Sequence, residues 1–142
     1  MNFAMWKKAL QIIPDVSKEE WDGLDLISKW LIATRAAVLV MTFLSAVLAG
    51  LFAWHDGYKV NLLSWFILTV GLVLAHASNN LFNDYTDYIR GVDQDNYFRT
   101  MYGPQPVAHG LMTKAQHLSY FFVTGLLALA CGVYLVLANG ND

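Results

Sequence analysis

The sequence predicts an all-α integral membrane protein, a helical bundle with three transmembrane helices. Hydrophobic residues make up 56% of its 142 residues and charged residues only 14%, a composition typical of membrane proteins. Three uncharged runs each approach the roughly 20 residues that cross a bilayer core; they extend over residues 36–54, 60–82 and 118–138. We therefore expect membrane helices near residues 31–54, 60–88 and 117–138.

Residues 1–30 form a separate amphipathic segment. Pro14 divides it, and Ser17 followed by Glu20 has the spacing of a capping box at the start of a helix. Apolar residues then recur at steps of three and four, as in an amphipathic helix: Trp21, Leu24, Ile27 and Leu31. Two short helices at the membrane interface would explain three tryptophans, although packing on the protein surface would explain them equally well: Trp6, Trp21 and Trp30.

Basic residues near the spans predict the topology of the remaining region, residues 31–142. Lys59 is the only basic residue between the first and second spans. The other eight fall on the opposite side: Lys7, Lys8, Lys18, Lys29, Arg35, Arg90, Arg99 and Lys114. The positive-inside rule therefore places the N-terminus and the 83–117 segment in the cytoplasm and the C-terminus on the other side.

The cytoplasmic loop at residues 88–117 is longer than the roughly 12–15 residues at which structureless connections become uncommon. It is also rich in aromatic and aliphatic residues. We expect a turn and one short helix that cap a cavity.

The net charge and the cysteine content argue against a nucleic-acid partner, an internal disulfide and a cysteine-based metal site. The net charge of −2 is too small to indicate a nucleic-acid partner. The single cysteine, Cys131, lies in an apolar run and excludes both an internal disulfide and a cysteine-based metal site.

A polar stripe enters the second span and ends in a cluster of carboxylates. Its members are separated by four, three and four residues, so they share one helix face: His76, Asn80, Asn83 and Asp87. Asp84 lies beside them, and Asp93 follows Gly91, a natural helix stop.

A charge deep in lipid costs about 2.5–3.5 kcal/mol even on lenient scales, so the stripe needs a partner. Clustered oxygen ligands suit Mg²⁺ held together with a phosphate-bearing substrate. A solvated helix end is the alternative for the carboxylates. For His76 we favour a core histidine bonded to a neighbouring helix.

The motif Asn83-Asp84-x-x-Asp87-x-x-x-Gly91-x-Asp93 resembles the first aspartate-rich motif of the UbiA superfamily of intramembrane prenyltransferases. Its Gly-x-Asp ending looks most like the dihydroxynaphthoate polyprenyltransferase branch. The segment from Gly103 to Leu111 is similar to a family loop that usually reads Arg-Pro-(Leu/Val)-x-x-Gly, with Gln105 in place of the arginine. Arg35 is similar to an arginine near the family's start. The resemblance covers about residues 30–138.

The resemblance implies a bundle of about nine helices that binds a prenyl diphosphate through Mg²⁺ and transfers the prenyl group to an aromatic acceptor in quinone biosynthesis. By this resemblance, the metal and diphosphate residues are Asn83, Asp87 and Asp93, with Asp84 as an accessory ligand. Candidates for contact with the diphosphate oxygens are Arg35, Arg90 and Lys114, the last two from position alone. The catalytic residues themselves are not indicated.

The family's second aspartate-rich motif has no counterpart in these 142 residues, which correspond to the N-terminal third of the family bundle. We therefore expect this chain to be inactive alone, and to bind the rest of its bundle or other membrane subunits together with lipid. The competing interpretation is an inactive structural subunit of a larger membrane complex that holds a lipid, quinone or pigment. We interpret His109 and His117 as residues of the membrane interface. Four tyrosines are interpreted as an aromatic belt in preference to a pocket lining: Tyr85, Tyr88, Tyr97 and Tyr102.

Overall fold

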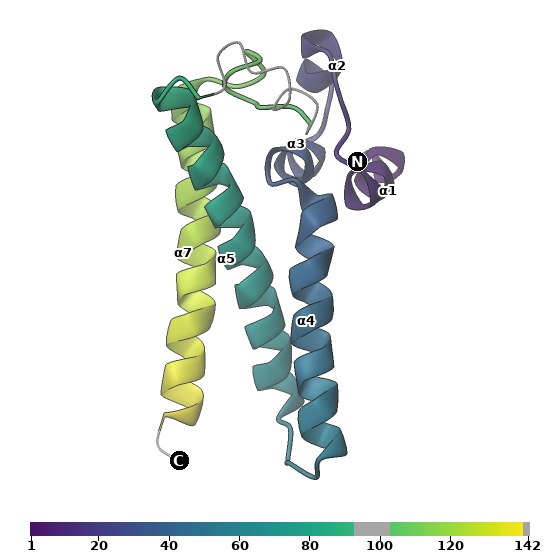
Figure 1. Ribbon diagram of the computed structural model, residues 1–142, viewed down its shortest axis with the longest axis vertical. Coiled ribbons are helices and arrows are strands. Elements are labelled where there is room, and N and C mark those ends of the chain that lie inside the picture. Colours follow the sequence, from purple (N-terminus) through teal and green to yellow (C-terminus); the bar gives the residue numbers. More distant parts are fainter. Residues whose placement is uncertain (93–102, 141–142) are drawn as a thin grey trace.

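Three long and three short helices make up the described part of the chain, residues 1–92 and 103–140 of a computed structural model; these residues contain helices and turns and no strand. In chain order the helices are α1 (Phe3–Gln11), α2 (Lys18–Asp22), α3 (Leu26–Ala33), α4 (Ala36–His55), α5 (Leu62–Ile89) and α7 (Lys114–Asn139). Figure 1 shows α4, α5 and α7 as long rods, with α5 packed on both others. The short helices gather at one end of the rods, and the C-terminus lies at the other.

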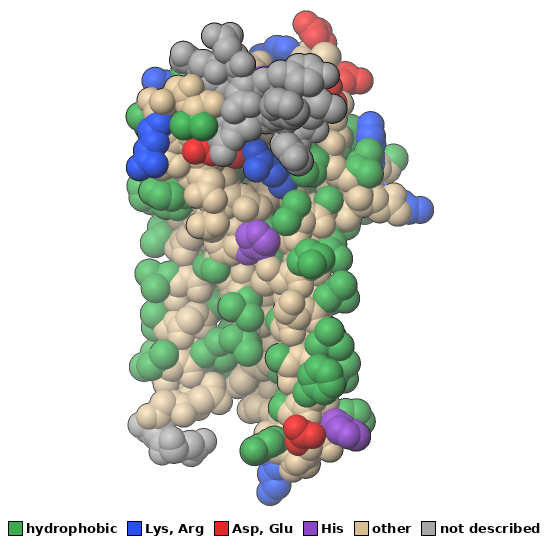
Figure 2. All heavy atoms as spheres, viewed as in Figure 1, with side chains coloured by type: hydrophobic (Ala, Val, Ile, Leu, Met, Phe, Trp, Pro, Cys, Tyr) green, Lys and Arg blue, Asp and Glu red, His purple; other side chains and the backbone are tan. Residues whose placement is uncertain are grey.

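The three long helices confirm the predicted membrane spans. Their lengths are 20, 28 and 26 residues, and each is apolar enough to cross a bilayer. At 1.5 Å per residue, α5 is about 42 Å long, which exceeds the hydrocarbon thickness of about 30 Å. The helix ends at the cap residue Arg90 as predicted, and its extension past the bilayer at this end stays a prediction. Figure 2 shows hydrophobic side chains along the length of the bundle and charged ones at its two ends.

The first long helix begins five residues later than predicted. Helix α3 ends at Ala33, and Arg35 takes a left-handed backbone conformation with φ 55° before α4 starts at Ala36. Arginine has no preference for this conformation, which costs a non-glycine residue roughly 1–2 kcal/mol. The break is held by contacts from α5: Asn80 Nδ2 donates to the carbonyl oxygen of Thr34 at 2.9 Å, and Arg35 pairs with a carboxylate.

The amphipathic segment after Pro14 also contains two helices where one was predicted. Ser17 and Glu20 form the expected capping box of α2. Gly23 ends α2, and Asp25 then caps α3, where its carboxylate accepts backbone hydrogen bonds from Ile27 and Ser28. The apolar spacing continues across this break, so periodicity alone did not reveal it.

Gly91 stops α5 as predicted. It has φ 69°, and its N–H donates to the carbonyl of Tyr88 while that of Val92 donates to Asp87. This pair of bonds is a Schellman motif, which satisfies carbonyl groups at the helix end.

Small residues allow the long helices to approach closely. A Cβ on Gly125 of α7 would lie 3.0 Å from Ser78 Oγ, and one on Gly71 of α5 would lie 2.9 Å from Cys131 Cβ. On the other side of α5, Trp65 covers Gly50 of α4. A Cβ on Gly132 of α7, by contrast, would meet no described atom within 4 Å.

The N-terminal segment and residues 103–113 form a cap over one end of the bundle. Its core contains residues from both segments and from α5: Ala9, Val16, Trp21, Ile32, Ala33, Leu81, Leu111 and Met112. Lys18 Nζ donates to the carbonyl of Leu111 at 3.1 Å. Residues 103–113 contain turns, and the rest of the predicted short helix falls at residues 93–102, outside the described part. That helix stays a prediction.

The described basic residues, apart from Lys59, belong to the cap or to helix ends beside it (Figures 1 and 2). Lys59 lies in the turn between α4 and α5, at the opposite end. Arg99 falls outside the described residues. The charge asymmetry behind the topology prediction is thus present, and the cytoplasmic assignment stays a prediction.

Candidate functional site

A cavity of about 630 Å³ lies under the cap, at the end of α5 that carries the carboxylates. Its lining comes from the N-terminal segment, the start of α4, the last turns of α5 and the 103–113 segment: Ile13, Arg35, Val38, Asn83, Asp84, Asp87 and Gln105. Four of the predicted site residues are therefore brought together here. Ile13 was not anticipated, because nothing in an isolated isoleucine indicates a distant cavity.

Arg35 and Asp84 form an ion pair at the wall of this cavity. The distance from Arg35 Nη2 to Asp84 Oδ1 is 2.6 Å, and the two side chains are 25% and 7% exposed. A buried carboxylate needs such a partner, because removal of its countercharge leaves an uncompensated charge in a medium of low dielectric constant. The pair holds Arg35 against α5 and gives Asp84 a cation within the chain. The sequence suggested Asp84 as an accessory metal ligand and did not predict this contact.

The first two residues of the polar stripe, His76 and Asn80, form hydrogen bonds between helices. His76 Nδ1 lies 2.7 Å from Thr42 Oγ1 of α4, which confirms the predicted bond to a neighbouring helix, although His76 is half-buried and not part of the core. Asn80 caps the end of α3 through Thr34. Only the last members of the stripe, Asn83 and Asp87, reach the cavity. They are four residues apart, so their side chains are neighbours on one face of α5.

Two of the predicted diphosphate contacts lie elsewhere. Arg90 is exposed at the C-terminus of α5. Lys114 Nζ lies 5.1 Å from the centre of the Tyr88 ring, in a cation–π contact. Neither belongs to the cavity lining, whereas Arg35 does. Asp93 falls outside the described residues, so its part in the site stays a prediction.

His117 is fully buried between α5 and α7, with Nε2 2.8 Å from the carbonyl oxygen of Leu81. The interpretation of His117 as a residue of the membrane interface is therefore wrong. Its ring also stacks on Tyr85 at 6.4 Å between centres. His109 lies at the exposed surface of the cap, where its Nδ1 accepts a 3.3 Å hydrogen bond from the backbone of Gln105.

The described residues contain no group of three histidine, cysteine or acidic side chains close enough to hold a metal by themselves. Asn83 and Asp87 could supply two oxygen ligands, which leaves the remaining positions for a substrate, water or other side chains. Such partial coordination is typical of Mg²⁺ sites that share the ion with phosphate groups.

Fold and site together define an integral membrane helical protein with an arginine–carboxylate cavity at one end of its bundle. The sequence model of the UbiA prenyltransferase family matches residues 38–139. The chain belongs to this family. The match includes nearly all of α4 and both other long helices, and it leaves out α1–α3 and Arg35. Neither a curated protein nor a solved structure gives a significant match to the chain.

Proposed function

We propose that the cavity under the cap binds a prenyl diphosphate with Mg²⁺, as part of a prenyltransferase that acts on an aromatic acceptor in quinone biosynthesis. Membership of the UbiA family supports a prenyltransferase-type function. The observation that carries the proposal is that the cavity collects the motif residues Asn83 and Asp87 together with Arg35, which lies 48 positions before Asn83 in the sequence. The Gly-x-Asp ending of the motif favours the dihydroxynaphthoate branch.

The donor atoms fit Mg²⁺. Asn83 offers an amide oxygen and Asp87 a carboxylate, both hard ligands that this ion prefers. Two protein ligands leave room for phosphate oxygens and water, and Asp93 is proposed as a further ligand. When bound, the ion would neutralise the charge that develops on the departing diphosphate.

Arg35 is proposed as the residue that orients the diphosphate. Its guanidinium is anchored by Asp84 through Nη2, and its buried Nε has no hydrogen-bond partner among the described residues. A planar guanidinium suits bidentate contact with phosphate oxygens. With substrate bound, the cap above the cavity would limit access of bulk water and so protect a carbocation-like centre. We place Arg90 and Lys114 outside this contact, because neither lines the cavity.

An inactive structural subunit is the second candidate function. The observation that favours it is the pairing of Asp84 with Arg35, which binds a motif carboxylate and the cavity's arginine to each other. Gln105, where the family usually has an arginine, removes another cation from the cavity wall. In that case the cavity would hold a lipid, quinone or pigment among the subunits of a larger complex.

In both cases we propose that the cap faces the cytoplasm and that α4, α5 and α7 pack against further membrane helices, either of the same bundle or of other subunits. The exposed polar side chain of Asn79, inside the uncharged run of α5, supports this assembly, since lipid cannot satisfy a polar group. The breadth of exposed apolar surface on the long helices is consistent with it.

The test is Mg²⁺-dependent binding of a non-hydrolysable prenyl diphosphate analogue to the purified chain in its membrane assembly. We expect saturable binding that is lost on chelation and abolished by Asp87→Asn, with assembly intact. Asp56→Asn, in the turn at the opposite end of the bundle, is the matched control and should bind as the unmodified protein does. Absence of Mg²⁺-dependent binding, or equal binding by the two variants, would overturn the enzyme proposal and favour the structural subunit.

A further inference from the structure

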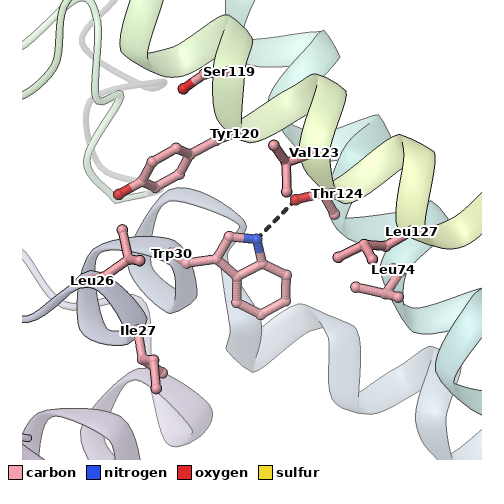
Figure 3. A pocket seen from close by; sticks show the side chains of 9 residues that line it. All are labelled: Leu26, Ile27, Trp30, Leu74, Ser119, Tyr120, Val123, Thr124 and Leu127. Atoms are coloured by element: carbon pink, nitrogen blue, oxygen red, sulfur yellow. Dashed lines mark hydrogen bonds between the residues drawn. The ribbon is translucent and has the colours of Figure 1, made fainter.

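A second cavity lies outside the carboxylate site, on a different face of the bundle. It has a volume of about 390 Å³ and is formed by α3, α5 and α7. Its lining consists of Leu26, Ile27, Trp30, Leu74, Ser119, Tyr120, Val123, Thr124 and Leu127 (Figure 3). Leu74 precedes His76 by two residues and therefore lies about 200° around α5 from the polar stripe. This lateral groove and the carboxylate cavity share no lining residue.

Apart from the Tyr120 hydroxyl, the polar side-chain atoms of the residues that line the lateral groove are paired within the described protein. Trp30 Nε1 donates to Thr124 Oγ1 at 2.9 Å, as Figure 3 shows, and Ser119 Oγ donates to the carbonyl of Gln116 at 2.7 Å. A water molecule in this groove would find few partners, and cavities of this kind favour apolar occupants. The groove therefore suits a hydrocarbon chain.

A basic cavity continues from the lateral groove toward the cap. It is lined by Lys18, Asp22, Lys29, Gln116 and others, and it shares Leu26 and Tyr120 with the groove. Lys18 pairs with Asp22 at 2.7 Å. Among the described residues no carboxylate pairs with Lys29, whose Nζ makes only a long 3.4 Å contact with the Asp22 carbonyl. One positive charge is thus left at this end.

The two cavities are ordered along α7 as the parts of a lipid are ordered in a membrane. The basic cavity reaches Gln116, in the first turn of α7, and the apolar groove reaches Leu127, three turns deeper into the span. Tyr120 lines both cavities, and Figure 3 shows its hydroxyl directed away from Thr124. Basic side chains beside a span attract anionic head groups, and apolar grooves beside them receive acyl chains.

We propose that this composite site binds one anionic phospholipid, with an acyl chain against Trp30 and the head group near Lys29. The charge left on Lys29 favours a phospholipid over an uncharged isoprenoid. The bound lipid would fasten α3 to α7 and thereby support the cap. This proposal does not depend on the prenyl diphosphate site.

The test uses phosphatidylglycerol and phosphatidylcholine with brominated acyl chains, added to the delipidated full-length protein in detergent. Bromine quenches tryptophan fluorescence on contact, and Trp30→Phe defines the part of the signal that comes from the groove. We expect saturable quenching of Trp30 by phosphatidylglycerol, with weaker binding of phosphatidylcholine. Lys29→Gln should lower the affinity for phosphatidylglycerol about fivefold, whereas Lys7→Gln, at the same end of the bundle, should not.

A second pair of variants tests the groove by substitutions at exposed positions, which should leave the fold intact. Val123 is 59% exposed and lines the groove, so Val123→Phe should fill it and remove the saturable quenching. Val133 is 50% exposed on the same helix and is not a lining residue, so Val133→Phe should bind as the unmodified protein does. Equal quenching by the two lipids, equal loss in the two phenylalanine variants, or displacement of phosphatidylglycerol by an uncharged polyprenol would overturn the proposal.

Discussion

The guanidinium of Arg35 donates a 2.6 Å hydrogen bond to the carboxylate of Asp84, across 49 positions of sequence. This contact fixes the start of α4 against the last turns of α5, and it forms at a residue with a left-handed backbone. Backbone strain of this kind persists only where the surroundings enforce it. The ion pair therefore has two consequences, one for the stability of the cap end and one for the geometry of the cavity.

Two substitutions at Arg35 should separate the contribution of the ion pair to stability from the cost of the left-handed backbone. Arg35→Gln leaves Asp84 without its countercharge, and we expect the free energy of unfolding to fall by about 3 kcal/mol. Arg35→Gly also removes the ion pair but relieves the left-handed strain, so it should be more stable than Arg35→Gln by about 1 kcal/mol. Thermal unfolding in detergent measures both, with Arg90→Gln as the control. Equal stability of Arg35→Gln and Arg90→Gln would contradict the importance of the pair.

The contact between α4 and α5 depends on Gly50. A Cβ at this position would lie 2.1 Å from Trp65 Cε2, and the indole N–H of Trp65 donates to the carbonyl of Ala46 at 2.9 Å. Gly50→Ala should displace the indole and destabilise the protein by about 1–3 kcal/mol. Gly132→Ala meets open space and should leave stability unchanged or slightly higher. Tryptophan emission and unfolding temperature report both effects. A normal emission spectrum for Gly50→Ala would show that the indole has another position available.

Asp25 should make the docking of α1 sensitive to acid. Partial desolvation acts to raise the pKa of its carboxyl, but hydrogen bonds from Ser28, Trp6 and the Asn2 backbone outweigh it and hold the pKa well below its ordinary value of 3.8. A carboxylate with a lowered pKa stabilises the fold above its unfolded pKa, and this contribution is lost as the pH falls through the folded value.

The unfolding temperature of the unmodified protein should therefore exceed that of Asp25→Asn at pH 7. The gap between them should be maintained down to about pH 4 and narrow on further acidification. Thermal unfolding across this pH range provides the measurement. A gap that stays constant below pH 4 would assign the effect of Asp25 to hydrogen-bond geometry and not to its charge.

Gly103 should be required for residues 103–113 to pack against the N-terminal segment. Its φ is 104°, and a Cβ there would lie 2.2 Å from Ile13 Cγ2. Gly103→Ala adds a steric clash to backbone strain, whereas Gly110→Ala, with φ 68° and open space around it, adds strain alone. We expect Gly103→Ala to increase proteolysis after Lys18 at pH 7, and Gly110→Ala to do so much less. Equal digestion of the two variants would mean that Ile13 moves aside without cost.

The side chain at position 105 should change the affinity of the cavity for prenyl diphosphate. Gln105 is 5% exposed and lines the wall beside the carboxylates. If the cavity binds prenyl diphosphate as proposed, Gln105→Arg should tighten binding about tenfold, because hydrogen bonds from a charged donor contribute about 1.5–3 kcal/mol. Gln105→Met, a variant of similar size without charge, serves as the control. The same affinity in all three proteins would place the diphosphate away from this wall.

Local signals in the sequence predicted the features that local chemistry determines. The three spans followed from uncharged runs, the start of α2 from Ser17 and Glu20, and the end of α5 from Gly91. The alignment of Asn83 with Asp87 followed from helical spacing. Each of these depends on residues within a few positions of one another.

Contacts between distant segments were not predictable in this way. The break at Arg35 is enforced by Asn80 and Asp84, and arginine itself carries no turn signal. The sequence left Trp30 open between the membrane interface and surface packing; in the structure it forms a wall of the lateral groove, where Thr124 accepts its N–H. A tryptophan has the same local pattern in both situations, so only its partner distinguishes them.

The bonds that hold the cap also set an order of events during synthesis. Lys18 and Trp30 bind partners at Leu111 and Thr124, which are 93 and 94 positions later in the chain. Contacts of such separation form late, because the intervening chain must first be made and its ends brought together. The N-terminal helices leave the ribosome first, yet their final docking must wait until the third span has begun to emerge. Until then, their apolar faces need the membrane surface or a chaperone for cover.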